Sequence, residues 1–84
     1  MKPMYYGIDV AATGENISRL RKSAGLTVKD IQAIMGFTSP NAVYKWERGE
    51  SIPALENLMV LSKLFGVRME EILVWSHPPP ERRT

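Results

Sequence analysis

The stretch that decides the fold runs from Thr27 to Gly49 and reads TVKDIQAIMGFTSPNAVYKWERG. Its first half carries the signals of a short helix. Thr27 with Asp30 three residues later predicts an N-terminal cap, because the hydroxyl and the carboxylate can satisfy free N–H groups of a first turn. Gly36 predicts the C-terminal stop, since glycine readily adopts the left-handed conformation in which many helices end. The pattern indicates a helix over about 28–35.

The second half of the stretch starts a new helix after a short turn. Ser39 is a capping residue, and Pro40 at the first helical position loses no hydrogen bond, because that N–H would be unpaired anyway. A helix over about 40–48 is expected, with Gly49 as its stop. Two short helices joined by a few residues that include glycine form a helix-turn-helix.

Outward from this stretch, apolar spacing predicts three more helices, over about 14–24, 54–65 and 69–74. Thr13 is the expected cap of the first of them. The helix over 54–65 is apolar most of the way round, which is typical of a helix buried at the centre of a domain. The predicted fold class is therefore all-α, with five helices.

Length and composition place these helices in one domain, since 84 residues of ordinary globular composition suffice for no more. The domain is expected over 13–75. An arm over 1–12, compatible with an extended conformation, precedes it, and a proline-rich tail over 76–84, expected to be disordered, follows it. Val74 and Trp75 lie at the end of the last helix, just before the tail, and form a candidate dimer surface, although they could equally fold back onto the core.

Several classes of function are disfavoured by composition. The chain has no cysteine, which excludes disulfides, thiolate zinc sites and cysteine nucleophiles. The single histidine, His77, lies in the tail, and no metal-ligand or phosphate-loop spacing is present. We therefore expect no enzyme, no metal, no cofactor and no small-molecule substrate. No apolar run is long enough to cross a membrane, so no membrane partner is expected either.

Positive charge is concentrated in the first half of the chain. Residues 1–48 hold seven Lys/Arg and four Asp/Glu, for +3, whereas residues 49–84 hold four and five, for −1. This distribution favours the first half as the side that faces a polyanion.

The second helix of the motif is the candidate for reading DNA, because the major groove admits one α-helix. Asn41 and Lys45 are four residues apart and share one face. Asparagine can make two hydrogen bonds to adenine, and lysine can donate to guanine acceptors. An alanine or a tyrosine ring could touch a thymine methyl. The predicted base-reading residues are Asn41, Lys45, Ala42, Tyr44 and Ser39.

Contacts to the DNA backbone are expected around helix termini, where free N–H groups bind phosphate. The predicted phosphate-contacting residues are Thr27, Lys29, Arg48 and Ser51. The alternative interpretation of the basic residues is an ordinary solvated helix face.

A set of residues at particular spacings makes the sequence recognisable. They are Gly25-Leu26-Thr27, Ile31, Gly36-Phe37, Val43, Trp46-Glu47-Arg48-Gly49, Ile52-Pro53, Leu58 and Gly66-Val67. With them the sequence resembles the phage-repressor (Xre/Cro-type) helix-turn-helix family over about 13–74. The resemblance implies a lambda-repressor-like five-helix bundle that binds operator DNA as a dimer. It also implies a partly buried, structural ion pair between Arg21 and Glu47.

Three departures from the family pattern concern the motif itself. Many members have a glutamine that clamps a phosphate where this chain has Val28. Many have a small alanine, facing the next helix, where this chain has Gln32. Nine residues separate Gly36 from Trp46, one more than in the commonest pattern.

Two functions stay open. The first is a sequence-specific transcriptional regulator, expected to be a repressor, that binds double-stranded DNA as a homodimer in the cytoplasm, associated with the nucleoid, of a bacterium or phage. The alternative is a protein-interaction module, such as the antitoxin of a toxin–antitoxin pair. Val28 and the modest net charge of +2 keep this protein partner open.

Overall fold

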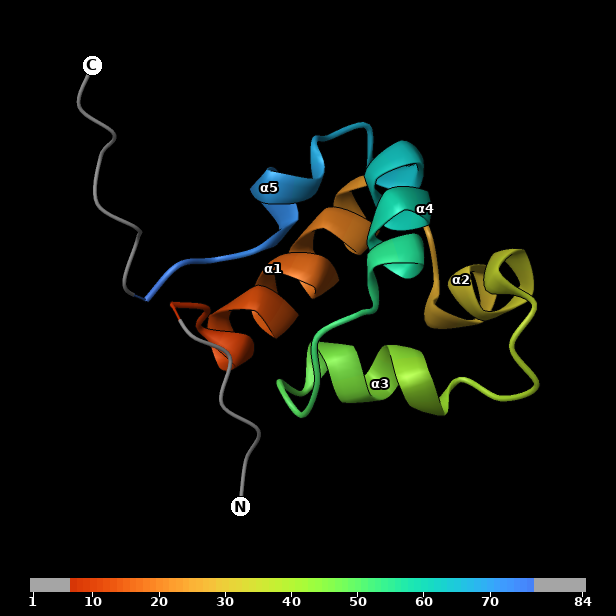
Figure 1. Ribbon diagram of the computed structural model, residues 1–84. Helices are drawn as coiled ribbons and strands as arrows, with labels where there is room; N and C mark the ends of the chain where they lie inside the picture. Colours follow the sequence, from red (N-terminus) through yellow and green to blue (C-terminus); the bar gives the residue numbers. More distant parts are fainter. Residues whose placement is uncertain (1–6, 77–84) are drawn as a thin grey trace.

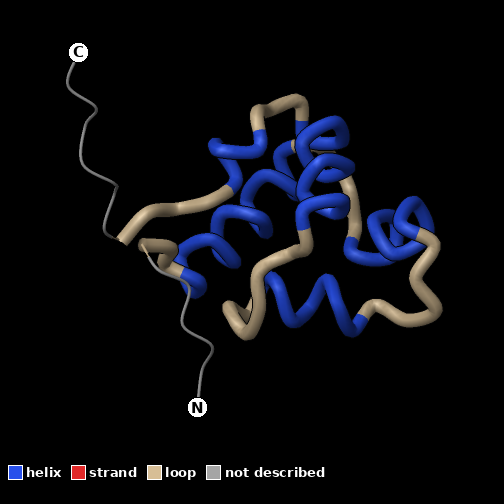
Figure 2. The backbone as a smooth tube through the Cα atoms, viewed as in Figure 1, coloured by secondary structure: helices blue, strands red, loops and turns tan. Residues whose placement is uncertain are grey.

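The computed structural model describes residues 7–76. Residues 1–6 of the expected arm and the tail from His77 on lie outside this range. Five helices follow one another in this part of the chain (Figures 1 and 2). They are α1 (Val10–Ser23), α2 (Val28–Met35), α3 (Asn41–Glu47), α4 (Leu55–Phe65) and α5 (Met69–Ile72). Between residues 7 and 76 there is no strand beyond one isolated bridge, so the all-α, five-helix prediction is confirmed there.

The start of α1 differs from the prediction. The helix begins at Val10, and its cap is Asp9, whose carboxylate accepts a hydrogen bond from the Ala12 N–H at 2.9 Å. Thr13, the expected cap, is instead buried inside the helix, and its hydroxyl oxygen accepts from the Val74 N–H at 2.9 Å. Aspartate is as good a cap as threonine, and the intervening residues tolerate a helix, so the earlier start costs nothing.

The predicted caps of α2 are present. The Asp30 N–H donates to the Thr27 hydroxyl at 3.0 Å, and the Thr27 N–H donates to the Asp30 carboxylate at 2.8 Å. Hydrogen bonds from the Thr27 N–H and, to a smaller extent, from the Thr27 hydroxyl hold the pKa of the Asp30 carboxyl below its usual value. Gly36 ends the helix with φ of +74°, a conformation that glycine adopts without steric cost.

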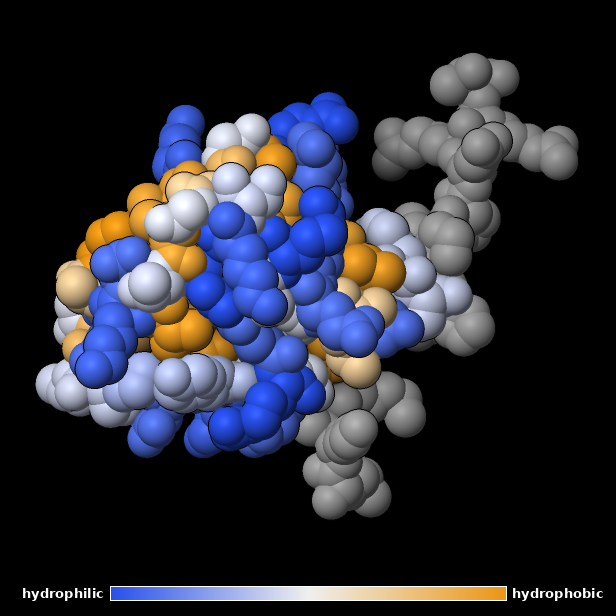
Figure 3. All heavy atoms as spheres, turned by 180° about the vertical axis from the view of Figure 1, so that it is seen from behind, coloured by the Kyte–Doolittle hydropathy of each residue, from blue (hydrophilic) through white to orange (hydrophobic). Residues whose placement is uncertain are grey.

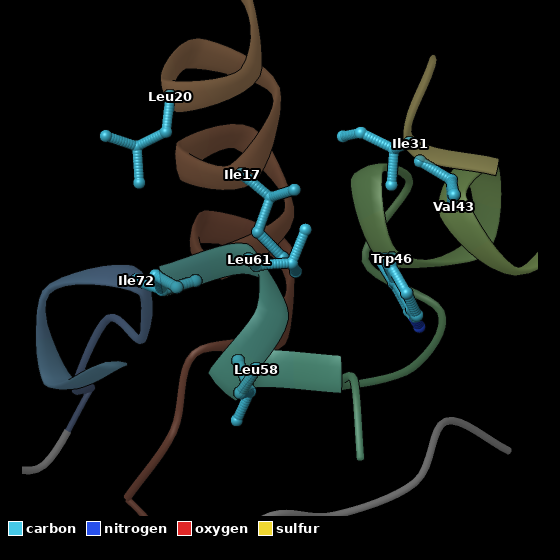
Figure 4. Close-up of a cluster of buried hydrophobic side chains, with 8 residues drawn as sticks. All are labelled: Ile17, Leu20, Ile31, Val43, Trp46, Leu58, Leu61 and Ile72. Carbon is cyan, nitrogen blue, oxygen red and sulfur yellow. The ribbon is translucent and has the colours of Figure 1, made fainter. Parts of the chain in front are cut away.

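The core is one cluster to which every helix contributes (Figure 4). Its buried members are Ile17, Leu20, Ile31, Val43, Trp46, Leu58, Leu61 and Ile72. The Trp46 ring meets Phe37 edge to face, with ring centroids 5.9 Å apart. Trp46 is therefore part of the core and anchors α3, and Phe37 packs against this core.

The expectation that α4 is the buried centre of the domain is wrong for one flank. Leu58 and Leu61 face the core, but Leu55 is 64% exposed and Met59 is 55% exposed. These two residues are one turn apart and lie on the same side of α4. Viewed from behind, the domain surface is largely hydrophilic, and apolar side chains show between the polar ones (Figure 3).

The backbone of α1 lies in close contact with the C-terminal end of α3. A Cβ atom added at Gly14 would collide with the Trp46 carbonyl oxygen and would lie 2.8 Å from that of Glu47. A second contact involves Ala11, one turn before Gly14 on α1. A Cβ added at Gly49 would lie 2.7 Å from the Ala11 Cα, and Gly49 has φ of +75°. Glycine at both positions lets the two backbones touch, which sets the distance of α3 from the rest of the domain.

The two ends of the described chain are fastened together beside α1. Ile8 and Trp75 form an antiparallel bridge. The Asp9 N–H donates to the Val74 carbonyl at 2.8 Å, and the Ser76 N–H donates to the Gly7 carbonyl at 2.8 Å. Trp75 nevertheless stays 46% exposed. No helix of the described chain is long and apolar enough to cross a membrane.

Replacing Gly14 by alanine should destabilise the domain by about 1–3 kcal/mol, because the added methyl overlaps backbone atoms that cannot move away cheaply. Alanine is otherwise the better helix former, so the sign of the effect separates packing from propensity. Urea denaturation measures the change. Ser23→Ala, at the exposed end of the same helix, is the control and should be near neutral. A Gly14→Ala variant at least as stable as the wild type would contradict the close contact.

Candidate nucleic-acid interface

Helix α3 presents one face to the core and the opposite face to solvent. Val43 and Trp46, three residues apart, are buried. Asn41, Lys45 and Arg48 follow a 3.6-residue repeat on the other side and are exposed. Because the helix has only seven residues, its orientation comes from tertiary packing rather than from its own stability.

A hollow of about 360 Å³ lies on the side of α3 that faces the turn, and we call it the turn-side hollow. Its lining residues are Phe37, Thr38, Ser39, Asn41, Ala42, Lys45, Trp46 and Ser51. It brings together four of the five predicted base-reading residues and one predicted phosphate contact. Asn41 and Lys45 are exposed there, whereas Ala42 is half-buried and packs against the core. Asn41 and Lys45 are therefore the freest to meet a ligand.

The long turn before α3 is held by side chains of its own neighbourhood. The Gln32 amide donates to the Phe37 carbonyl at 3.4 Å. The Asn41 N–H donates to the Ser39 hydroxyl at 3.4 Å, and α3 begins at Asn41, one residue later than predicted. Gln32 thus stabilises the longer turn by a hydrogen bond that an alanine at this position could not make.

A second, open groove of about 520 Å³ lies on the other side of α3, against α1, and we call it the α1-side groove. Its lining residues are Glu15, Ser18, Arg19, Lys22, Tyr44, Glu47 and Arg48. Tyr44, predicted to read bases with Asn41 and Lys45, lines this groove and does not line the turn-side hollow. Ser18, Arg19 and Lys22 were not among the predicted site residues, although the four-residue spacing of Ser18 and Lys22 places two polar groups on one flank of α1.

A helix-turn-helix family profile matches residues 17–72, which is most of the domain and includes the whole lining of the turn-side hollow. The chain belongs to the helix-turn-helix family. A curated relative, the HTH-type transcriptional activator BcrR of Enterococcus faecalis, is 34% identical over 59 residues. The match covers 70% of this chain and 28% of that relative, so the chain spans well under half of the relative's length.

Solved structures show the same helix-turn-helix fold at low identity. The restriction-modification controller protein C.AhdI from Aeromonas hydrophila has a TM-score of 0.66 at 23% identity, covering 76% of this chain and 96% of that one. The S. venezulae BldD DNA-binding domain has a TM-score of 0.64 at 21% identity, covering 79% and 97%. A hypothetical transcription factor, NHTF, from Neisseria has a TM-score of 0.66 at 18% identity, covering 90% of each chain.

The helix-turn-helix is braced from behind by the ion pair between Arg21 and Glu47. The guanidinium makes two hydrogen bonds to the carboxylate, at 2.7 and 3.2 Å, and a third to the Leu26 carbonyl at 3.0 Å. Both side chains are only about an eighth exposed. The hydrogen bond to Glu47 raises the pKa of Arg21 above its usual value. The pair links α1 to the end of α3 and to the segment before α2, so its role is structural.

The N-terminal end of α2 carries two predicted phosphate contacts, Thr27 and Lys29, which are both exposed. The Thr27 hydroxyl is already engaged in the cap, because its oxygen accepts the Asp30 N–H and its hydrogen bond to the Asp30 carboxyl helps to lower the pKa of that group. Asp30 places a negative charge at the same helix end. Lys29 must therefore supply most of the attraction for an anion here.

Arg48, the other predicted phosphate contact with a full charge, is paired with Glu50. The guanidinium Nε lies 2.5 Å from the Glu50 carboxylate, and both side chains are about half exposed. The hydrogen bond from Arg48 lowers the pKa of Glu50, so the carboxylate stays ionised to a lower pH than usual. Glu50 consequently competes with any phosphate for Arg48.

Replacing Glu50 by glutamine should therefore strengthen binding to duplex DNA. Because Arg48 is then free to bind a phosphate, the slope of log affinity against log salt should become steeper by up to about 1. A fluorescence-anisotropy titration at several salt concentrations measures both quantities. Glu70→Gln, an exposed substitution on α5 with the same change in charge, is the control. Equal gains for the two variants would show only the effect of net charge and would remove Arg48 from the interface.

Proposed function

We propose that this chain is a sequence-specific DNA-binding transcriptional regulator that lays α3 in the major groove. One observation carries the proposal: Asn41 and Lys45 stand one turn apart and exposed on a short helix whose opposite face is locked into the core. A helix held in this way can present side chains to base edges without losing order on binding. The helix-turn-helix family match supports the same assignment.

Direct reading is assigned to Asn41 and Lys45. The asparagine amide can make two hydrogen bonds to an adenine edge, and the lysine ammonium can donate to guanine O6 and N7. Ala42 and Ser39 also line the turn-side hollow but are half-buried, so a base edge must enter the hollow to meet them. We infer that they tune the fit, whereas the two exposed side chains carry most of the discrimination.

Contacts to the DNA backbone are assigned to both ends of the helix-turn-helix. Thr27 and Lys29 lie at the start of α2, and Ser51 lines the turn-side hollow from the loop after α3. Arg48 extends from the end of α3. Contacts of this kind position the helix and add affinity without sequence preference.

We further propose that the protein acts as a homodimer through the Val74–Trp75 surface, in the cytoplasm. A tryptophan that is 46% exposed beside a half-buried valine is suited to cover a second copy. If the protein-partner alternative holds, a different chain would occupy this surface. Repression is the expected direction of regulation, although the curated relative is named an activator. A reporter assay with the chain's own promoter decides the direction.

The reading role of Asn41 is tested by Asn41→Ala. Its affinity for a duplex selected from a randomised pool by the wild-type protein should fall by about 1–3 kcal/mol, because a base loses its bidentate partner. Binding to mixed-sequence DNA should change little. Competition titrations with both duplexes measure the difference. An equal loss on the two duplexes would move Asn41 from base reading to a backbone contact.

The dimer surface is tested by Trp75→Gln in sedimentation equilibrium. The wild type should have the mass of two chains at micromolar concentrations. The variant should dissociate tenfold or more readily, since a central buried aromatic contributes about 2 kcal/mol or more. Leu55→Gln, on the other exposed apolar patch, is the matched control. Dissociation by Leu55→Gln alone would place the dimer contact on α4.

A further inference from the structure

We propose that the α1-side groove is a second DNA-backbone site, in which Lys22 and the Tyr44 hydroxyl hold one phosphodiester of the bound duplex. The proposal rests on the proposed function, because the groove borders the helix that is assigned to the major groove. It adds α1 to the DNA interface. It also changes the role of Tyr44 from base reading to backbone contact.

The walls of the groove supply both kinds of group that a phosphate needs. Lys22 and Ser18 line it from α1, and Tyr44 and Arg48 line it from α3. Lys22 is exposed and Tyr44 is 42% exposed, so both can reach an anion that lies in the opening. A hydroxyl and an ammonium are both donors, which matches the acceptor-only oxygens of a phosphodiester.

The charges around the groove leave Lys22 and Arg19 as its cations outside ion pairs. Among the residues that the structure describes, neither of them belongs to an ion pair, whereas Arg48 is paired with Glu50. The Glu47 carboxylate is matched by Arg21 behind the groove. Glu15 remains as an opposing carboxylate on the α1 wall, next to Arg19. The positive side of the groove is therefore its Lys22 end.

The position of Arg19 is fixed by contacts that lead back into the fold. Its guanidinium donates to the Asn16 side-chain oxygen at 2.6 Å. The Asn16 amide in turn donates to the Glu71 and Ile72 carbonyls, both at 2.9 Å. Arg19 thus adds a positive charge that is held by Asn16, while Lys22 is the side chain free to make the direct contact.

The placement of the groove points to DNA rather than to a small anion. It is open along α3, and a helix that enters the major groove has a phosphodiester backbone on each side. The Arg21 guanidinium ties the end of α1 to the Leu26 carbonyl, just before Thr27. This hydrogen bond holds the end of α1, which carries Lys22, near the start of α2, which carries Thr27 and Lys29.

The test compares Lys22→Gln with Lys63→Gln, an exposed lysine on α4 that lines neither the turn-side hollow nor the α1-side groove. Binding to a mixed-sequence 20-bp duplex is measured by anisotropy between 50 and 200 mM salt. Lys22→Gln should flatten the slope of log affinity against log salt by about 1, which is a change of about fourfold over this range. Lys63→Gln should leave the slope unchanged. Equal slopes for the two variants, with the wild type still binding, would overturn the groove site alone.

A second measurement assigns the contact to a phosphate of the duplex. Neutral methylphosphonate linkages are placed one at a time along the duplex selected by the wild type. One linkage that weakens wild-type binding should have no further effect on Lys22→Gln or on Tyr44→Phe. Additive losses at every linkage would contradict the proposal.

Saturable binding of inorganic phosphate alone, without any change in the salt slope for DNA, would assign the groove to a free anion instead. A wild type that binds no duplex at 50 mM salt would overturn the groove site and the proposed function together.

Discussion

The backbone contact between α1 and the C-terminal end of α3 is the constraint on which the domain depends. Gly14 leaves room for the Trp46 and Glu47 carbonyl oxygens, and Gly49 leaves room for Ala11. The Arg21–Glu47 pair also joins α1 to the end of α3 and stabilises this contact with two hydrogen bonds. A helix as short as α3 does not keep its shape alone in water. Its direction relative to α2, and so the geometry of the whole motif, is set by this contact and by Trp46 in the core.

This arrangement divides the surface of α3 into three parts with different tasks. Val43 and Trp46 are buried and hold the helix in place. The turn-side hollow collects the small and polar side chains suited to base edges, with Asn41 and Lys45 exposed. The α1-side groove collects Tyr44 and basic groups suited to a backbone. Sequence preference and general affinity would then reside on opposite sides of one helix, where they can change independently.

The local signals of the sequence were sufficient for the parts of the fold that depend on a few neighbouring residues. The Thr27–Asp30 cap and the Gly36 stop are present as predicted, because both are hydrogen-bonding and backbone effects within one turn. The early start of α1 was missed because Asp9 and Thr13 are both good caps. Only the tertiary contact of Thr13 with Val74 decides between them.

The remaining differences depend on which element packs against which. Apolar spacing made α4 look buried all round, but the helices that pack on it, mainly α5 and α1, leave Leu55 and Met59 exposed. In the same way, helical spacing alone could not tell on which side of α3 Tyr44 lies, nor that Lys22 of α1 would line a groove with it. These placements follow from the position of α1 across α3, a contact between residues far apart in the chain that no local pattern encodes.

The most direct measurement is an NMR titration of the ¹⁵N-labelled chain with the duplex selected by the wild-type protein. Binding should shift the amide signals of residues 41–48 most, together with those at the start of α2 and at the end of α1 near Lys22. The signals of the Leu55–Met59 flank should stay nearly unchanged. Large shifts confined to α4 and α5, with α3 unaffected, would contradict DNA reading by α3 and would point to a different binding surface.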